Sequence, residues 1–167
     1  MQTEITDADV FEAIRRGYTD LADASDEEIL DYFEAVDGAS LQGHIGNIKG
    51  ILFEQEYVKQ LQETGVDAQL FEETNHPESD IAIYDEDCEM IEELQLKATQ
   101  NPSYIDETLQ ELPEDITVVT TSEVADRFGD EVVDSGISET LLEESISETI
   151  NPISPFSVIG WCFGVFC

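Results

Sequence analysis

The chain has 167 residues, of which 41% are hydrophobic, enough for one buried core and too few for two full-sized domains. Its 40 acidic residues outnumber 6 basic ones, which leaves a formal net charge of −34. This balance argues against ordinary tight nucleic-acid binding, because that affinity comes largely from lysine and arginine side chains that neutralise phosphates.

Three explanations of the acidity remain open: adaptation to a high-salt cytoplasm, mimicry of nucleic acid, or a partly disordered acidic chain. Disorder is the least favoured, because the acidic residues alternate with periodic Leu, Ile, Val and Phe. The odd number of cysteines, Cys88, Cys162 and Cys167, has no CxxC spacing and indicates neither a disulfide framework nor a zinc site. With no secretory signal at the N-terminus, we expect a cytoplasmic protein.

The first segment, residues 1–39, predicts two short amphipathic helices. The first covers residues 7–22 and has apolar side chains at helical spacing: Val10, Ile14 and Leu21. The second starts at Ser25, where the run to Glu28 forms a capping box, and its apolar stripe ends at Asp37-Gly38. The pair could serve as a lid or a docking module, but such stripes usually indicate packing on a core.

The second segment, residues 40–150, opens with a longer helix and three strands. Apolar residues recur at helical spacing over residues 40–64, until Gly65 ends the helix. Strands are predicted at residues 66–71, 80–84 and 90–98.

A helix follows over residues 104–112, and residues 116–120 form a β-branched strand. The order helix, three strands, helix, strand predicts an α/β fold with a mixed sheet flanked by helices, because the crossover helix lets the fourth strand run parallel to an earlier one. A short helix is then expected at 122–128. A last helix at 138–150 has Ser138 as its N-cap, with a box partner in position.

The third segment, residues 151–167, changes composition, and residues 153–167 contain no charged side chain. The segment is shorter than the roughly 20 residues that cross a bilayer. Gly160 and Gly164 form a GxxxG pair, which favours helix packing in an apolar membrane segment. Membrane contact through this tail and burial of the tail as a final strand or helix are the two alternatives.

Three residues near the ends of the second and third strands could carry chemistry. Asp80 opens the second strand, whereas Gln95 and Lys97 lie late in the third, so a hairpin brings the acid and the lysine together. The carbonyl of Leu96 can point to where a hard cation would bind. Hydrolysis of a phosphodiester with Mg²⁺ needs one or two acidic ligands and a cation that orients or activates water.

At these residues the sequence resembles the PD-(D/E)xK nuclease superfamily, in particular its Mrr-type restriction endonuclease branch. The QxK motif of that branch matches Gln95-Leu96-Lys97, and its GxxFE motif matches residues 50–54. The resemblance spans residues 43–120. It implies a restriction-endonuclease-like αβββαβ core and a site that binds Mg²⁺ or Mn²⁺ through Asp80, Glu54 and Leu96.

Each candidate also has a structural interpretation. Glu54 is one of many acids, Lys97 could form a structural salt bridge with Glu93 or Asp80, and a lone histidine such as His44 or His76 is usually structural. Cys88 lies in a predicted turn and is expected to be inert.

Two functions follow. The first is a Mg²⁺-dependent nuclease that hydrolyses DNA, with Asp80 and Glu54 as metal ligands and Gln95 and Lys97 completing the site. The second is a catalytically inactive protein of nuclease-like fold that works as a membrane-associated or partner-binding module. Fold alone does not separate them.

Overall fold

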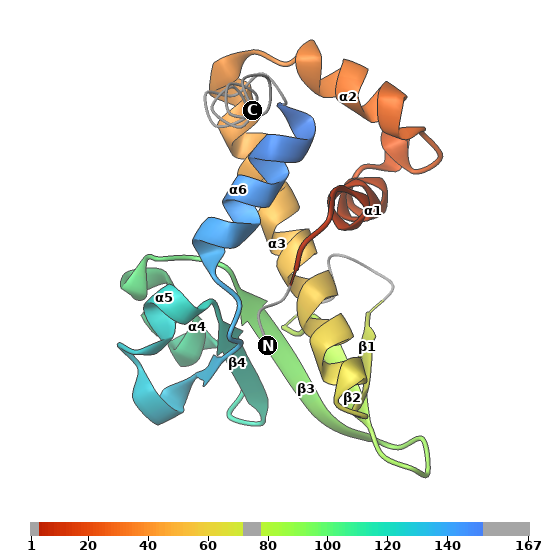
Figure 1. Cartoon of the computed structure of the whole chain (residues 1–167). Helices are drawn as coiled ribbons and strands as arrows, with labels where there is room; N and C mark the ends of the chain where they lie inside the picture. Colours follow the sequence, from red (N-terminus) through yellow and green to blue (C-terminus); the bar gives the residue numbers. More distant parts are fainter. Residues whose placement is uncertain (1–3, 72–77, 152–167) are drawn as a thin grey trace, which may run out of the picture.

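The protein is described by a computed structural model that covers residues 4–71 and 78–151. Figure 1 shows an α/β fold in which helices flank a five-stranded mixed sheet, preceded by a helical N-terminal region. The predicted fold class is therefore confirmed at this level. No helix within these ranges is long and apolar enough to cross a membrane. The apolar tail lies outside the described residues.

The N-terminal region consists of α1 (Asp7–Gly17), a 3₁₀ turn (Thr19–Leu21) and α2 (Asp26–Glu34). The helix predicted for residues 7–22 thus ends early. Gly17 packs so closely on α3 that a Cβ atom there would collide with the side chain of Ile51. The chain turns away at this crossing.

The start of α2 was predicted correctly, whereas its end was not. The Ser25 hydroxyl accepts from the Glu28 amide, and the Glu28 carboxylate accepts from the Ser25 amide, as in a capping box. Asp37-Gly38 does not end α2 but begins α3 (Gly38–Glu63), because the Asp37 carboxylate accepts from two amides of the first turn of α3.

The sheet has the order β1-β2-β3-β4-β5. Its strands are β1 (Asp67–Leu70), β2 (Ile81–Tyr84), β3 (Met90–Lys97), β4 (Ile116–Thr120) and β5 (Val133–Asp134). Strand β2 runs opposite to the other four strands and pairs antiparallel with both β1 and β3. The pairs β3–β4 and β4–β5 are parallel. Consequently the carboxyl ends of four strands and the start of β2 lie at one edge of the sheet.

The helix after β3 begins at a well-defined cap. Asn101 caps α4 (Pro102–Glu111), which has a proline in its first turn. The predicted helix 122–128 shortens to α5 (Ser122–Ala125) followed by a 3₁₀ turn (Gly129–Glu131).

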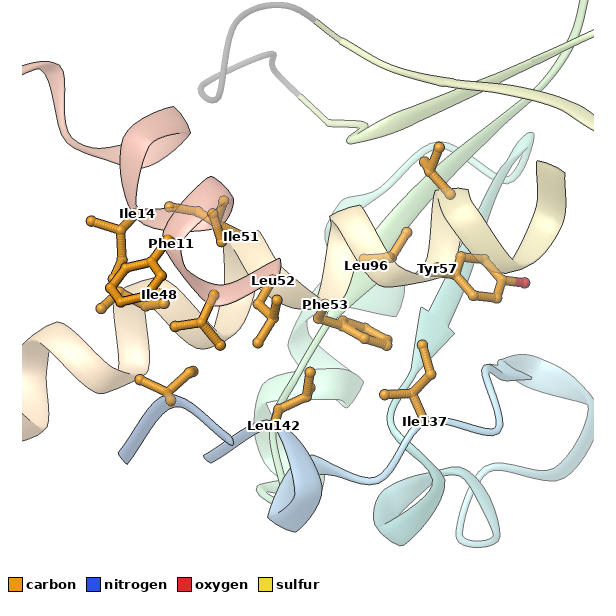
Figure 2. Packing of buried hydrophobic residues seen from close by; sticks show 14 of the residues in the cluster. Phe11, Ile14, Ile48, Ile51, Leu52, Phe53, Tyr57, Leu96, Ile137 and Leu142 are labelled. Carbon is orange, nitrogen blue, oxygen red and sulfur yellow. The ribbon is translucent and has the colours of Figure 1, made fainter. Parts of the chain in front are cut away.

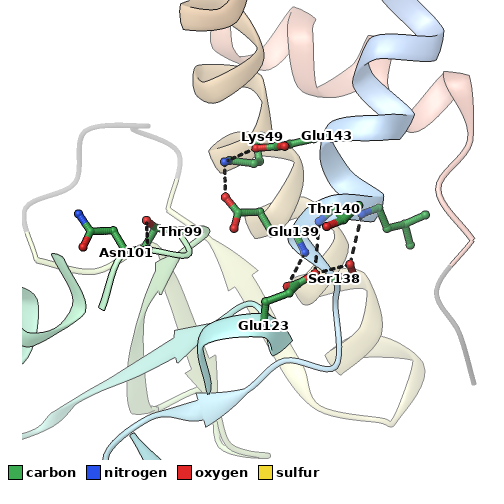
Figure 3. A network of polar contacts seen from close by, with 9 residues as sticks. Lys49, Thr99, Asn101, Glu123, Ser138, Glu139, Thr140 and Glu143 are labelled. Carbon is green, nitrogen blue, oxygen red and sulfur yellow. Dashed lines mark hydrogen bonds and ion pairs between the residues drawn. The ribbon is translucent and has the colours of Figure 1, made fainter. Parts of the chain in front are cut away.

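The last helix, α6 (Glu139–Ile150), has Ser138 as its N-cap, but the predicted box partner is wrong. Leu141, whose side chain has no acceptor, occupies the box position, so the first-turn amides use Glu123 of α5 instead (Figure 3). The amide of Glu139 donates to this carboxylate at 2.8 Å. Lys49 of α3 then pairs with the carboxylates of Glu139 and Glu143, which joins α6 to α3.

Hydrophobic residues fill both sides of the sheet. On one side, α3 packs between the sheet and helices α1 and α6, with Phe53 at the centre of the cluster in Figure 2. On the other side, Ile105 of α4 and Val124 of α5 pack on Val118 of β4. Its neighbour Val119 points to the α3 side, as the alternation of a strand requires.

One acidic side chain lies inside the larger cluster. Glu56 of α3 is fully buried, and neither carboxylate oxygen has a hydrogen-bond partner among the described residues. The Lys59 ammonium is 3.8 Å from it and 3.5 Å from Asp9 of α1. Burial, and then the charge of Asp9, raise the pKa of Glu56 to about 7.

We predict that Glu56 makes the protein less stable as the pH rises. Because its pKa is about 7 in the folded state and 4.5 as the ordinary value, the folded state holds the proton more tightly. The free energy of unfolding should therefore fall as the pH rises from about 4.5 through 7, by roughly 2–3 kcal/mol. Glu56→Gln should remove this part of the pH dependence in urea unfolding, and Glu34→Gln, at an exposed position of α2, should retain it. Parallel pH profiles for the two variants would contradict the prediction.

Candidate functional site

The candidate site is organised around Asp80, immediately before β2. Its amide donates to the Leu94 carbonyl at 2.8 Å, which extends the pairing of β2 with β3. Its carboxylate oxygen Oδ2 accepts from the Gln95 side-chain amide at 2.6 Å and from the Leu96 backbone amide at 2.7 Å. The start of β2 thus meets the end of β3 as the hairpin predicted.

Strand alternation separates the residues of β3 into two faces. Leu94 and Leu96 are buried in the cluster beneath α3, whereas Gln95 and Lys97 lie on the opposite face. The Gln95 amide nitrogen is also 3.4 Å from the Leu96 carbonyl oxygen, so this backbone acceptor lies beside the Asp80 carboxylate.

Lys97 reaches toward α4. Its ammonium donates to the Tyr104 hydroxyl at 3.3 Å and lies 5.1 Å from the centre of the Tyr104 ring. Both contacts are with a neutral side chain. These contacts orient the lysine ammonium without neutralising its charge.

Glu54 enters the site from α3, where it follows the buried Phe53. Its side chain is 17% exposed and lies 3.4 Å from the guanidinium of Arg16 of α1. Burial and the charge of Asp80 raise the pKa of Glu54 to about 7, although Arg16 and Lys97 oppose that rise. Asp80, Arg16 and Lys97 are therefore each close enough for their charge to act on Glu54.

The donors of this site suit a hard divalent cation. In the described part of the chain no group of three or more His, Cys, Asp or Glu is placed to hold a metal. The donor set here is two carboxylates, Glu54 and Asp80, with the Leu96 carbonyl beside them, and Mg²⁺ is commonly held by one or two carboxylates. A divalent cation would also relieve the repulsion that raises the Glu54 pKa, so the residues fit the ion.

An open pocket of about 330 Å³ adjoins Lys97 between β3 and α4. Gln95, Lys97 and Tyr104 line one part of it, and its remaining lining includes the acidic residues Glu78, Glu107 and Glu111. A ligand can therefore approach Lys97, but an anionic ligand meets negative side chains on the way.

The other candidates from the sequence lie elsewhere. His44 is about 15 Å along α3 from Glu54, and its Nδ1 is 2.8 Å from the Tyr18 hydroxyl within an aromatic cluster. His76 lies outside the described residues. Cys88 is exposed in the turn between β2 and β3.

Sequence reasoning missed Arg16, which the crossing of α1 over α3 brings to Glu54. A local signal existed, because Arg15 and Arg16 are two of only six basic residues and lie next to each other within a predicted helix. Their contact with α3 is non-local, so spacing along the chain could not assign it.

Comparisons of the chain with models of protein families, with curated proteins and with solved structures gave no match. Function is therefore inferred from the geometry and chemistry of the described residues.

We predict that Asp80→Asn lowers the pKa of Glu54 from about 7. The substitution removes the negative neighbour that disfavours the Glu54 carboxylate, while Arg16 and Lys97 continue to favour it. Carboxyl carbon chemical shifts, followed by NMR across a pH titration, would give this pKa. Glu56, whose pKa is raised by burial and Asp9, is the internal control and should not shift. If Glu54 titrates identically in both proteins, the two carboxylates do not share a site.

Proposed function

We propose that this protein is a Mg²⁺-dependent nuclease with a restriction-endonuclease-like core, and that it hydrolyses phosphodiester bonds in DNA. One observation carries the proposal: Gln95 at the end of β3 donates to Asp80 at the start of β2. Glu54 of α3 lies near enough to Asp80 and Lys97 for their charges to act on it. The order α3, β1, β2, β3, α4, β4 supports the αβββαβ core that the resemblance implies.

The location supports a catalytic site. Ligands of α/β proteins bind outside the carboxyl ends of parallel strands, where loops rather than strand neighbours surround the side chains. Lys97 ends β3, which is parallel to β4, and Asp80 reaches the same edge because β2 runs in the opposite direction.

The acidic half of the site is held in place before any ligand arrives. Two hydrogen bonds from β3 orient the Asp80 carboxylate, and packing of Phe53 fixes the position of Glu54. Mg²⁺ bound there would polarise the phosphate and lower the pKa of an attacking water. The role of Glu54 and Asp80 is to hold that charge, with the Leu96 carbonyl as a third oxygen.

Lys97 supplies the positive charge next to the carboxylates. Its ammonium is steadied by the Tyr104 ring and remains at an open pocket. From this position it can orient the attacking water or a non-bridging phosphate oxygen, whose charge grows as the phosphorus–oxygen bond breaks.

The acidic surroundings determine the conditions under which DNA can bind. Glu78, Glu107 and Glu111 around the pocket, together with a net charge of −34, repel a polyanion. Molar salt shortens the screening length to about 3 Å and weakens this repulsion. The same pocket favours the alternative, an inactive nuclease-like fold that binds a partner through its acidic surface.

We predict that the purified protein cleaves DNA with Mg²⁺ or Mn²⁺ in molar KCl and that Lys97→Ala reduces the rate about 10²-fold or more. Asp80→Asn and Glu54→Gln should also lose cleavage, because each removes an anionic ligand. Supercoiled plasmid and labelled duplex provide the assay.

Lys59→Ala is the matched control, since Lys59 is a lysine of α3 that pairs with Asp9 and Glu56 rather than with the candidate site. It should cut at the wild-type rate. A wild-type protein without metal-dependent cleavage, or a Lys97→Ala variant of full activity, would overturn the nuclease proposal in favour of the partner-binding alternative.

A further inference from the structure

The few basic side chains of this acidic protein have different kinds of partner. Arg15 binds the Asp26 carboxylate and the Ala24 carbonyl, which joins α1 to α2. Lys49 binds Glu139 and Glu143, and Lys59 lies between Asp9 and Glu56. These three ion pairs connect elements of the fold.

The two cations at the candidate site make weaker contacts than those of Arg15 with Asp26 and of Lys49 with Glu139 and Glu143. Lys97 contacts a neutral phenol, and both terminal nitrogens of Arg16 lie 3.4 Å from a single oxygen of Glu54. A strong charge-assisted hydrogen bond would be about 2.7–2.9 Å. Arg16 is therefore beside Glu54 without being fully engaged by it.

The position of Arg16 is nevertheless well defined. Its neighbour Gly17 forms the closest part of the crossing between α1 and α3, against Ile51. The Arg16 side chain remains 22% exposed, so it can meet a ligand. α1 thus presents a cation to the same edge where Asp80 and Lys97 lie.

We propose that Arg16 is a substrate-binding residue of this site, and that its guanidinium contacts a phosphate of the nucleic-acid strand. The inference rests on the proposed nuclease function and deepens it. The helical N-terminal region then forms part of the substrate site.

Guanidinium chemistry supports this role. Arginine carries five N–H donors in a planar fork that matches phosphate oxygens, and it keeps its charge at any working pH. The two terminal nitrogens of Arg16 contact Glu54, and the guanidinium has further N–H donors for a second anion. The charges of Arg16 and Lys97 both act on Glu54, so a phosphate bound beside this carboxylate would be near two cations.

The test measures binding of a fluorescein-labelled DNA duplex by anisotropy over a range of KCl concentrations, with Ca²⁺ in place of Mg²⁺. Arg16→Gln should weaken binding about tenfold or more. It should also reduce the slope of log affinity against log salt by about 0.9, the value expected for one lost phosphate contact. Arg16→Lys should keep most of the slope, and Arg15→Gln should keep all of it.

Mn²⁺ binding, measured by electron paramagnetic resonance, distinguishes direct contact of Arg16 with DNA from an indirect effect in which Arg16 positions Glu54. Arg16→Gln should retain Mn²⁺ affinity, and in cleavage it should raise KM more than it lowers kcat. An unchanged salt slope in Arg16→Gln, or a loss of Mn²⁺ affinity that accounts for its loss of DNA binding, overturns the role of Arg16. Those results would leave the nuclease proposal intact if the wild type still cleaves, whereas absence of both DNA binding and cleavage in the wild type overturns both.

Discussion

Burial of α3 between the sheet and helices α1 and α6 is the constraint on which the rest of the structure depends. Ile48, Leu52 and Phe53 are almost fully removed from water, and each such side chain contributes about 1.5–3 kcal/mol. The helix has buried residues on several sides, so its rotation about its own axis is fixed by packing. That rotation determines that Glu54, next to Phe53, points to the open edge of the sheet.

The extreme acidity is accommodated by where the charges lie. Most carboxylates are on the surface, where water and salt screen them, and the interior is built from Ile, Leu, Val and Phe. Lys49 forms part-buried ion pairs where α3 meets α6, and Lys59, whose side chain is 47% exposed, pairs with Asp9 where α3 meets α1. With so few cations, those at the edge of the sheet are a significant fraction of the positive charge in the molecule.

The sequence predicted the elements whose signals are local. Alternation and β-branched residues located β4 at the residues observed, and the strand pairing that brings Asp80 to Gln95 followed from a short hairpin. β5 was missed because it has only two residues in an acidic stretch and depends on β4 for its pairing. The helix end predicted at Asp37-Gly38 was wrong because this pair is typical of both a helix end and a helix start.

Contacts between residues far apart in the chain could not be predicted from local signals in the sequence. Glu123 reaches the first turn of α6, and Arg16 reaches Glu54, across separations that depend on packing angles. The motif match selected Glu54 from the sequence, but its proximity to Asp80 required the position of α3 on the sheet. Candidate residues could therefore be chosen from the sequence, whereas the electrostatic environment of Glu54 required the fold.

Glu54 and Glu56 of α3 show why the edge of the sheet, rather than burial alone, defines the candidate site. Glu54 and Glu56 both have a pKa of about 7, and in both burial is the largest cause. Glu56 is closed off from solvent and faces α1, so no ligand can use its charge. Glu54 is partly open, with a second carboxylate at Asp80 and cations at Arg16 and Lys97. A raised pKa alone therefore does not define a site, and the proposed binding of a metal ion and a phosphate rests on the charged neighbours of Glu54.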